Sequence, residues 1–241
     1  MLKTIGLSKR FGALVAANNV SMEVGAGEVV GIIGTNGAGK TTFVNMITGY
    51  LRPSSGHIWL GGEEVTGLRP MDIARRGVGR SFQVSQLFQG LSAFENLLVA
   101  AGVGSRSVLS LLRDPERIAA CSQIFKELGL SAYQDQKIAA MPQGARKLLD
   151  IAMALAAAPK LLVLDEPTSG VSSQQKMEIM DRVIQSVAGN SMAVILIEHD
   201  MEIIERYVDR IFAFAQGEVV CEGHPEKVLN DPIVREKILG V

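Results

Sequence analysis

Cysteine and aromatic residues are scarce in this chain of 241 residues. It holds 2 Cys and 1 Trp, and Phe, Trp and Tyr together make up 5% of the sequence. Cys121 and Cys221 lie far apart and show no metal-ligand spacing, which excludes a disulfide framework and a cysteine-based zinc site. We expect both thiols to be reduced and buried in the folded chain.

Long hydrophobic runs are also missing. A membrane-spanning helix needs about 18 or more consecutive apolar residues, and the longest candidate, residues 151–164, is interrupted by Pro159 and Lys160. The first residues, MLKTIGLSKRF, have no apolar core followed by a small-residue cleavage site. The sequence therefore predicts a chain that stays in the cytosol and does not insert directly into a membrane.

An excess of charge of either sign is absent as well. The 24 Lys and Arg residues balance 25 Asp and Glu residues, which gives a formal net charge of −1. Nucleic-acid binding through phosphates depends on clustered, uncompensated basic residues. We therefore expect no nucleic-acid partner.

The apolar residues that are present, 47% of the chain, alternate between strand and helix patterns. Buried strands are predicted at 29–33, 161–164 and 192–198, and a helix at 40–48. Segments 210–215 and 219–222 flank Gln216-Gly217 and predict a hairpin. Helices between such strands indicate a parallel sheet covered on both faces, and hence an α/β fold.

Between residues 84 and 158 the strand pattern gives way to helical periodicity. Ser92 and Glu95 have the spacing of a capping box. Asp114-Pro115 begins a second helix, which ends at Gly129. Its apolar face is predicted to contain Ile118, Cys121, Phe125 and Leu128. This block is predicted to be a helical insertion in the α/β fold.

A phosphate-binding loop follows the first predicted strand. Gly34 to Thr41 fit the pattern G-x-x-x-x-G-K-[ST], between an apolar strand and a helix. In such a loop the backbone N–H groups and the lysine surround phosphate oxygens, and the threonine hydroxyl offers a Mg²⁺ ligand. The residues expected to bind the nucleotide here are Gly34, Asn36, Gly37, Ala38, Gly39, Lys40, Thr41 and Thr42.

Acidic residues and a histidine stand at the ends of two later strands. Asp165 and Glu166 follow the strand at 161–164, and His199 follows the strand at 192–198. Asp165 is placed to hold Mg²⁺, Glu166 to act as general base towards a water molecule, and His199 to hydrogen-bond a terminal phosphate. Each also has a plain structural interpretation, as a helix cap or a residue in a strand-to-helix turn.

Together these motifs resemble the ATP-binding subunit of an ABC transporter over almost the whole chain. The phosphate loop is followed by Arg80-Ser-Phe-Gln83, Leu-Leu-Val-Leu-Asp-Glu-Pro and Ile-Glu-His-Asp in the family's order. The chain is most similar to the ATPases that import branched-chain amino acids. The resemblance implies a P-loop NTPase (RecA-like) parallel-sheet core with an antiparallel β subdomain and an inserted α-helical subdomain. The core would comprise residues 1–83 and 159–241, and the inserted subdomain residues 84–158.

The resemblance also assigns roles that the residues alone leave open. Phe11 would stack on adenine, Gln83 would reach both Mg²⁺ and the attacking water, and His199 would sense the terminal phosphate. The implied cofactors are ATP and Mg²⁺, the metal being held by Thr41, Gln83 and Asp165. Without the resemblance, Phe11 reads as a core aromatic residue and Gln83 as a surface amide.

Membrane partners are implied in the same way. The family pairs two ATPase subunits with two integral-membrane permease subunits, and an extracytoplasmic solute-binding protein acts through the permeases. A short permease helix would dock in a groove formed partly by residues 84–98. The chain would then lie peripherally on the cytoplasmic face of the inner membrane.

The signature segment departs from the family pattern. Where relatives carry Leu-Ser-Gly-Gly-Gln, residues 141–145 read Met-Pro-Gln-Gly-Ala, so that Pro142, Gln143 and Gly144 would face the nucleotide of the partner subunit. Pro142 has neither a hydroxyl nor an N–H group. Ser172 also replaces an acidic or amide residue that crosses the dimer interface in relatives.

These departures predict an asymmetric heterodimer in which the pocket completed by this signature is slow or inactive. Two alternatives stay open: a regulatory subunit that binds nucleotide with little hydrolysis, and the ATPase of a lipid exporter. A soluble ABC ATPase of translation or DNA repair is disfavoured, because the chain holds one nucleotide domain and no long coiled-coil insertion. The transported solute is not encoded in this sequence.

Overall fold

The computed structural model describes residues 1–102 and 114–240. Its larger sheet has six strands in the order β10-β9-β3-β8-β7-β6. All neighbouring pairs are parallel except β9 with β10. The strands are β3 (Val29–Gly34), β6 (Val78–Ser81), β7 (Leu161–Asp165), β8 (Ala193–Ile197), β9 (Arg210–Ala215) and β10 (Glu218–Gly223).

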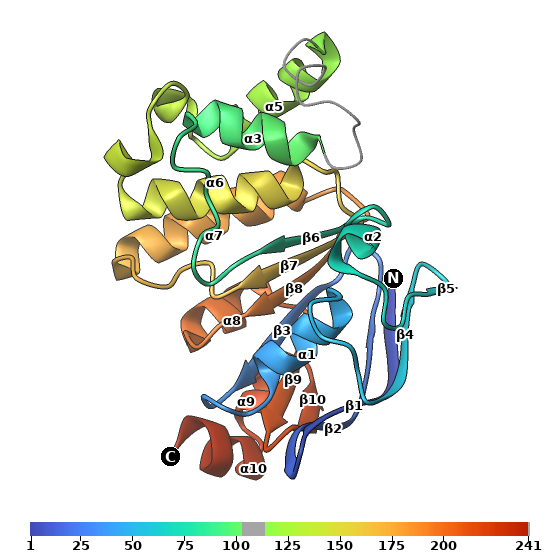
Figure 1. Cartoon of the computed structure of the whole chain (residues 1–241). Coiled ribbons are helices and arrows are strands. Elements are labelled where there is room, and N and C mark those ends of the chain that lie inside the picture. Colours follow the sequence, from blue (N-terminus) through green and yellow to red (C-terminus); the bar gives the residue numbers. More distant parts are fainter. Residues whose placement is uncertain (103–113, 241) are drawn as a thin grey trace.

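A second, antiparallel sheet of four strands is built mainly from the N-terminal residues, in the order β2-β1-β4-β5. Its strands are β1 (Leu2–Phe11), β2 (Leu14–Val24), β4 (Ser55–Leu60) and β5 (Glu63–Glu64). Figure 1 shows this sheet beside helix α1 (Lys40–Ile47), which follows β3. The side chains on its inner face share one hydrophobic cluster with β3 and α1.

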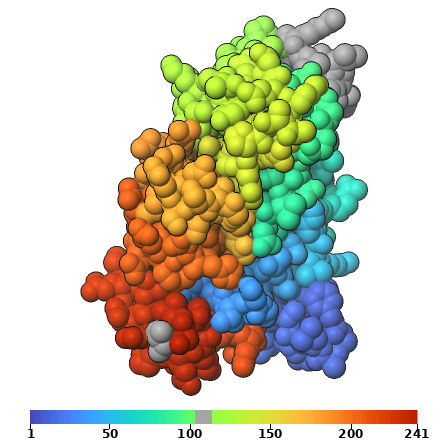
Figure 2. All heavy atoms as spheres, turned by 90° about the vertical axis from the view of Figure 1, so that its left-hand side faces the viewer, coloured from blue at the N-terminus to red at the C-terminus, as the bar shows by residue number. Residues whose placement is uncertain are grey.

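The helices of residues 93–155 cover one end of the molecule, where Figures 1 and 2 show them away from the N-terminal sheet. They are α3 (Ala93–Ala101), α5 (Pro115–Glu127), the 3₁₀ turns η1 (Ser131–Tyr133) and η2 (Ile138–Ala140), and α6 (Gln143–Leu155). The other helices are α2 (Pro70–Ala74), α7 (Ser173–Val187), α8 (Met201–Tyr207), α9 (Pro225–Leu229), α10 (Pro232–Val234) and the π-helical turn η3 (Arg235–Leu239).

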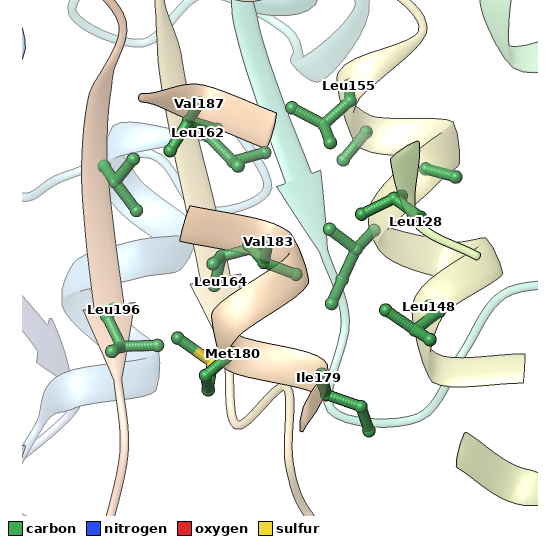
Figure 3. Packing of buried hydrophobic residues seen from close by; sticks show 14 of the residues in the cluster. Leu128, Leu148, Leu155, Leu162, Leu164, Ile179, Met180, Val183, Val187 and Leu196 are labelled. Carbon is green, nitrogen blue, oxygen red and sulfur yellow. The ribbon is translucent and has the colours of Figure 1, made fainter. Parts of the chain in front are cut away.

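One hydrophobic cluster joins the helical end to the larger sheet. In Figure 3 the apolar side chains of α7 lie against those of β7 and β8, beside those of α6. The labelled members are Ile179, Met180, Val183 and Val187 on α7, Leu162, Leu164 and Leu196 on β7 and β8, Leu148 and Leu155 on α6, and Leu128 after α5. Burying a leucine or valine side chain stabilises the fold by about 1.5–3 kcal/mol, so this cluster fixes α6 firmly against the sheet.

Most elements expected from the sequence are confirmed, with boundaries shifted by one or two residues. Ser92 and Glu95 form the capping box of α3, and Asp114 caps α5. Gln216 and Gly217, with φ of 52° and 84°, make the expected tight turn between β9 and β10. The division into residues 1–83 with 159–241 and residues 84–158 stays a prediction.

Two details differ from the expectations. The sequence pattern did not single out β6, a strand of four residues at the edge of the larger sheet. Cys121 is buried as expected, but Cys221 is only half-buried, because it lies on the edge strand β10. Both thiols are free.

Within the described residues, no helix combines the length and the apolar character that a membrane span requires.

Candidate nucleotide site

Four parallel strands end at the same edge of the larger sheet, and each is followed by a predicted site residue. Strand β3 leads into the phosphate loop, β6 into Gln83, β7 into Glu166 and β8 into His199. The carboxyl ends of parallel strands are where open α/β sheets hold ligands. The topology therefore brings four segments that are distant in sequence to one place.

The phosphate loop packs closely against its neighbours at Gly34 and Gly39, where there is no room for a side chain. A Cβ atom on Gly34 would lie 2.4 Å from the carbonyl oxygen of Phe214, and one on Gly39 would lie 2.5 Å from that of Ala16. Gly39 also adopts a left-handed φ of 101° directly before α1, where no side chain caps the helix. The first amides of α1 therefore remain available to an anion.

The other loop residues line the same turn. Asn36, Gly37 and Thr41 are exposed, Thr42 is half-buried and Ala38 is buried. The amide of Gly217 donates to the carbonyl of Ala38 at 2.9 Å, which ties the β9–β10 turn to the loop.

Lys40 lies across the loop rather than in solvent. Its Nζ donates to the carbonyl oxygens of Gly34 at 2.7 Å and Thr35 at 3.1 Å. Burial lowers the pKa of Lys40, while the carboxylates of Glu166 and Asp165 act in the opposite direction. The ammonium is thus close to both acidic residues and poorly hydrated, which strengthens its attraction for phosphate.

The three residues expected to act in catalysis meet through hydrogen bonds. Gln83 Nε2 donates to Glu166 Oε2 at 2.6 Å, and His199 Nε2 lies 3.2 Å from Glu166 Oε1. The backbone of Glu166 has a φ of 50°, a left-handed conformation that is strained for a residue with a side chain. The surrounding contacts thus hold Glu166 in a fixed, unfavourable conformation at the centre of this group.

Asp165 has a partner that the sequence did not predict. Its Oδ2 accepts a hydrogen bond from Arg80 Nη2 at 2.9 Å, and both side chains are 8% exposed. The pairing of β6 with β7 places the two residues together, although 85 positions separate them.

A Mg²⁺ ion fits the side chains that the sequence assigned to it. Thr41, Gln83 and Asp165 offer oxygen ligands only, which suits a hard cation. In the part of the chain that the structure describes, no cluster of three or more His, Cys, Asp or Glu side chains would hold a metal unaided. Magnesium is usually bound by one or two carboxylates together with substrate phosphates.

Phe11 lies at the end of β1 in the hairpin that leads to Ala16. Its side chain is 50% exposed, and Lys9 Nζ lies 5.2 Å from its ring centroid. The core interpretation of Phe11 is therefore wrong for this structure. The ring is exposed and free to stack on a base, and Ala16 of the same hairpin lies against Gly39 of the phosphate loop.

Three further residues support the site through hydrogen bonds to the segments that carry its residues. Sequence patterns gave no signal for them, because their contacts are with residues distant in sequence. Buried Lys147 on α6 donates to the backbone carbonyls of Gln83 and, at 3.4 Å, of Glu166. Burial lowers its pKa, against the field of Asp150 and Glu166. Glu198 Oε1 accepts from the amide and hydroxyl of Thr168, at 3.1 and 2.7 Å.

The third is Asp150, also on α6. Its carboxylate accepts the backbone amides of Phe82 at 2.8 Å and Gln86 at 3.1 Å. Burial raises its pKa, although both amides favour the charged form. Helix α6 is thus fastened to the segment that carries Gln83.

The signature segment forms the start of α6. Pro142 is the N-cap residue, without a side-chain hydrogen bond to the helix, and Pro142 and Gln143 are exposed. The Gln143 side chain lies where a Cβ atom on Gly170 would be. Ser172 caps α7 and forms a capping box with Gln175.

Comparisons with known proteins agree with this geometry. A family model described as "ABC transporter" matches residues 17–169. The branched-chain amino acid transport ATP-binding protein BraF of Pseudomonas aeruginosa is 34% identical, over all of this chain and 98% of the relative. LivG of Escherichia coli K12 is 34% identical over the same shares, and a probable LivG of Methanocaldococcus jannaschii is 32% identical, over 100% and 97%.

Solved structures give the same result. The ADP conformation of the ATP-binding cassette MJ1267 superposes with a TM-score of 0.89 and 31% identity, over 100% of this chain and 99% of that one. A nucleotide-free cassette of an ABC transporter gives a TM-score of 0.88 at 31% identity, over 98% and 97%. The fold is that of a P-loop NTPase, as expected. The chain belongs to the ABC transporter family, as an ATP-binding cassette that hydrolyses ATP.

Proposed function

We propose that this chain powers the import of branched-chain amino acids, or of a related small solute, through membrane permease subunits. The observation that carries the proposal is the convergence of Gln83, Glu166 and His199 at the strand ends beside the phosphate loop. The names of BraF and LivG, which resemble the chain over its full length, support the solute class.

The site residues divide the chemistry of hydrolysis among them. The amides of the phosphate loop and Lys40 bind the phosphates, while Phe11 stacks on the base. Thr41, Gln83 and Asp165 would hold Mg²⁺, which would offset charge on the terminal phosphates. Glu166 orients the attacking water and accepts its proton, a role that typically contributes about 10²–10⁴ in rate. His199 donates towards the terminal phosphate.

A groove beside this site is the proposed docking place for a permease. It has a volume of about 600 Å³ and is lined by Tyr50 after α1 and by residues of α2, α6 and the segments around β6, among them Met71, Phe82, Gln86 and Met153. Tyr50 and Met71 are 57% and 60% exposed. Of residues 84–98, the segment that the resemblance assigned to permease docking, the groove includes Gln86. The chain would thereby sit on the cytoplasmic face of the inner membrane, with the solute-binding protein acting from the other side.

We further propose that the ATPase dimer is asymmetric. In a head-to-tail pair, the start of α6 would contact the partner's nucleotide. Pro142 offers neither a hydroxyl nor an N–H there, so only the first amides of the helix remain as donors. Each lost donor to transition-state charge costs about 10²–10³ in rate. The nucleotide pocket within this chain retains its phosphate loop and its catalytic residues. It hydrolyses ATP when a second ATPase subunit supplies a complete signature segment.

Pro142 also favours one alternative, a subunit that binds ATP as a regulator and hydrolyses little. The hydrogen-bonded group around Glu166 argues against it, since a subunit without hydrolysis needs no strained, positioned base. A lipid-exporter ATPase has no observation of its own in its favour.

The test is reconstitution with the second ATPase and the permeases in membrane vesicles. We expect slow ATP turnover by the isolated chain and a large rise in the complete complex, with ATP-dependent uptake of labelled leucine. Fast turnover by the isolated chain would contradict the asymmetric dimer. Turnover in the complex without amino-acid uptake, but with lipid transfer, would contradict the importer.

A further inference from the structure

Arg80 is a buried cation near the site that donates three side-chain hydrogen bonds. Neither the family motifs nor the mechanism gives it a role. Its side chain is 8% exposed. Nη2 donates to Asp165 Oδ2 at 2.9 Å, and Nη1 donates to Asn45 Oδ1 at 2.7 Å and Thr48 Oγ1 at 3.0 Å. The guanidinium thus links the end of β7 to helix α1, which begins with Lys40 and Thr41.

Two aromatic rings hold the other side of the guanidinium. Its carbon lies 4.8 Å from the ring centroid of Phe82 and 5.5 Å from that of Tyr50. The rings themselves pack edge to face, 5.7 Å apart. Both rings and Arg80 line the apolar groove of about 600 Å³. Arg80 therefore lies between the groove and the carboxylate at the strand end.

The pairing with Arg80 makes the two carboxylate oxygens of Asp165 inequivalent. Oδ2 is taken by Arg80, while Oδ1 has no hydrogen bond to any described residue. A carboxylate held by one oxygen has its rotamer fixed and keeps the other oxygen for a ligand, as partners behind metal ligands commonly arrange. The planar fork of arginine also reaches Asp165 and α1 at once, which the single point charge of lysine does not reproduce.

We propose that Arg80 is a positioning residue for Mg²⁺ binding: it fixes the Asp165 carboxylate and is itself held by the Tyr50 and Phe82 rings of the groove. The proposal deepens the proposed function, because it rests on Asp165 serving the metal.

Competition between Arg80 and Mg²⁺ for the Asp165 carboxylate would have the opposite effect on metal affinity. If Arg80 merely competed with Mg²⁺ for Asp165, its removal would make the metal bind more tightly. Positioning requires weaker binding. The sign of the change in Mg²⁺ affinity therefore separates the two.

The experiment measures the affinity of a fluorescent ATP analogue for the full chain, first in EDTA and then during a Mg²⁺ titration. An E166Q background removes hydrolysis, so that the readout is binding. For Arg80→Met we expect the affinity for the ATP analogue in EDTA to stay within about twofold of that of the E166Q parent. The Mg²⁺ concentration that gives half of the change in binding should rise about tenfold or more, the usual loss of metal affinity when a residue that orients a metal ligand is removed. The Mg²⁺ requirement of Arg80→Lys should lie between those of the E166Q parent and R80M. Tyr50→Leu should raise the Mg²⁺ requirement by a smaller factor.

Arg210→Met is the matched control. Arg210 also pairs with a carboxylate, Glu28 at 2.8 Å, and lies 5.0 Å from the Phe212 ring, but it stands at the opposite end of the strands. Its Mg²⁺ titration should equal that of the wild type. Circular dichroism verifies folding, and R80K carries the test if R80M does not fold. An unchanged or lower Mg²⁺ requirement in the folded Arg80 variant would overturn the proposal. Failure of leucine uptake would bear on the proposed function alone, since this titration needs neither permease nor solute.

Discussion

The side-chain amide of Gln83 donates to the carboxylate of Glu166 at 2.6 Å, across a separation of 83 residues. The two residues follow β6 and β7, which pair in parallel, and Lys147 holds both of their backbone carbonyls from α6. The position of the proposed base is therefore set by three segments together. A change in any one of them reaches the reacting atoms through a hydrogen bond.

The phosphate loop offers a direct test of close packing. Gly37 and Gly39 both have left-handed φ values, 81° and 101°, but a Cβ atom meets nothing within 4 Å at Gly37 and a backbone oxygen at 2.5 Å at Gly39. We expect Gly37→Ala to cost about 1–2 kcal/mol of unfolding free energy. Gly39→Ala should cost about 1–3 kcal/mol more. Urea unfolding of the two variants measures the difference, and equal losses would show that the clash is relieved cheaply.

Substitution of Asp150 should lower both the stability of the fold and the rate of ATP hydrolysis. Asp150→Ala leaves the amides of Phe82 and Gln86 without their acceptor, at about 1–3 kcal/mol each. Because these amides flank Gln83, we also expect kcat to fall while the affinity for ATP changes little. Asp150→Asn keeps one acceptor oxygen and should lose less in both respects. Urea unfolding and steady-state ATPase kinetics check this, and a stable D150A with native kcat would contradict it.

The ion pair of Lys176 with Asp200, 2.8 Å long, predicts a pH window. The hydrogen bond to Lys176 lowers the pKa of Asp200, and the same bond raises the pKa of Lys176. The pair's contribution is therefore complete between the ordinary values of about 3.9 and 10.4. It is lost as the pH falls through the lowered pKa of Asp200, or rises through the raised pKa of Lys176.

Asp200→Asn tests this window, because asparagine still caps α8. We expect the variant to be less stable by about 0.2–1 kcal/mol near neutral pH. Its melting temperature should approach that of the wild type as the pH falls well below the ordinary aspartate pKa of about 3.9, or rises well above the ordinary lysine pKa of about 10.4. A difference that persists unchanged at pH values far below about 3.9 and far above about 10.4 would show that charge pairing is not its origin.

Local patterns predicted what depends on neighbouring residues. The capping box at Ser92, the cap at Asp114 and the turn at Gln216-Gly217 are decided within a few positions, and all are confirmed. The roles of the strand-end residues could be expected because parallel strands bring their carboxyl ends together. Arg80, Lys147 and Asp150 could not be identified as site residues, since each is tied to a strand-end segment by a partner 64 or more positions away: Asp165, Gln83 and Phe82, respectively. Strand β6 is too short for its pattern to be distinctive.

The signature prediction concerns Pro142. In dimers formed by this chain alone, Pro142→Ser restores both an N–H and a hydroxyl and should raise ATP turnover about tenfold or more. Pro142→Ala restores only the N–H and should give a smaller rise. Phosphate-release assays on the two variants separate the contributions. Native turnover in both would show that position 142 does not limit hydrolysis.

The most direct test of the central claim is single-turnover hydrolysis by Glu166→Gln in the assembled complex. We expect E166Q to bind ATP with an affinity close to that of the wild type, while hydrolysis slows by a factor of about 10²–10⁴ and the ATP-bound complex accumulates. Hydrolysis by E166Q at the native rate would contradict the assignment of Glu166 as the base, and with it the mechanism proposed for this site.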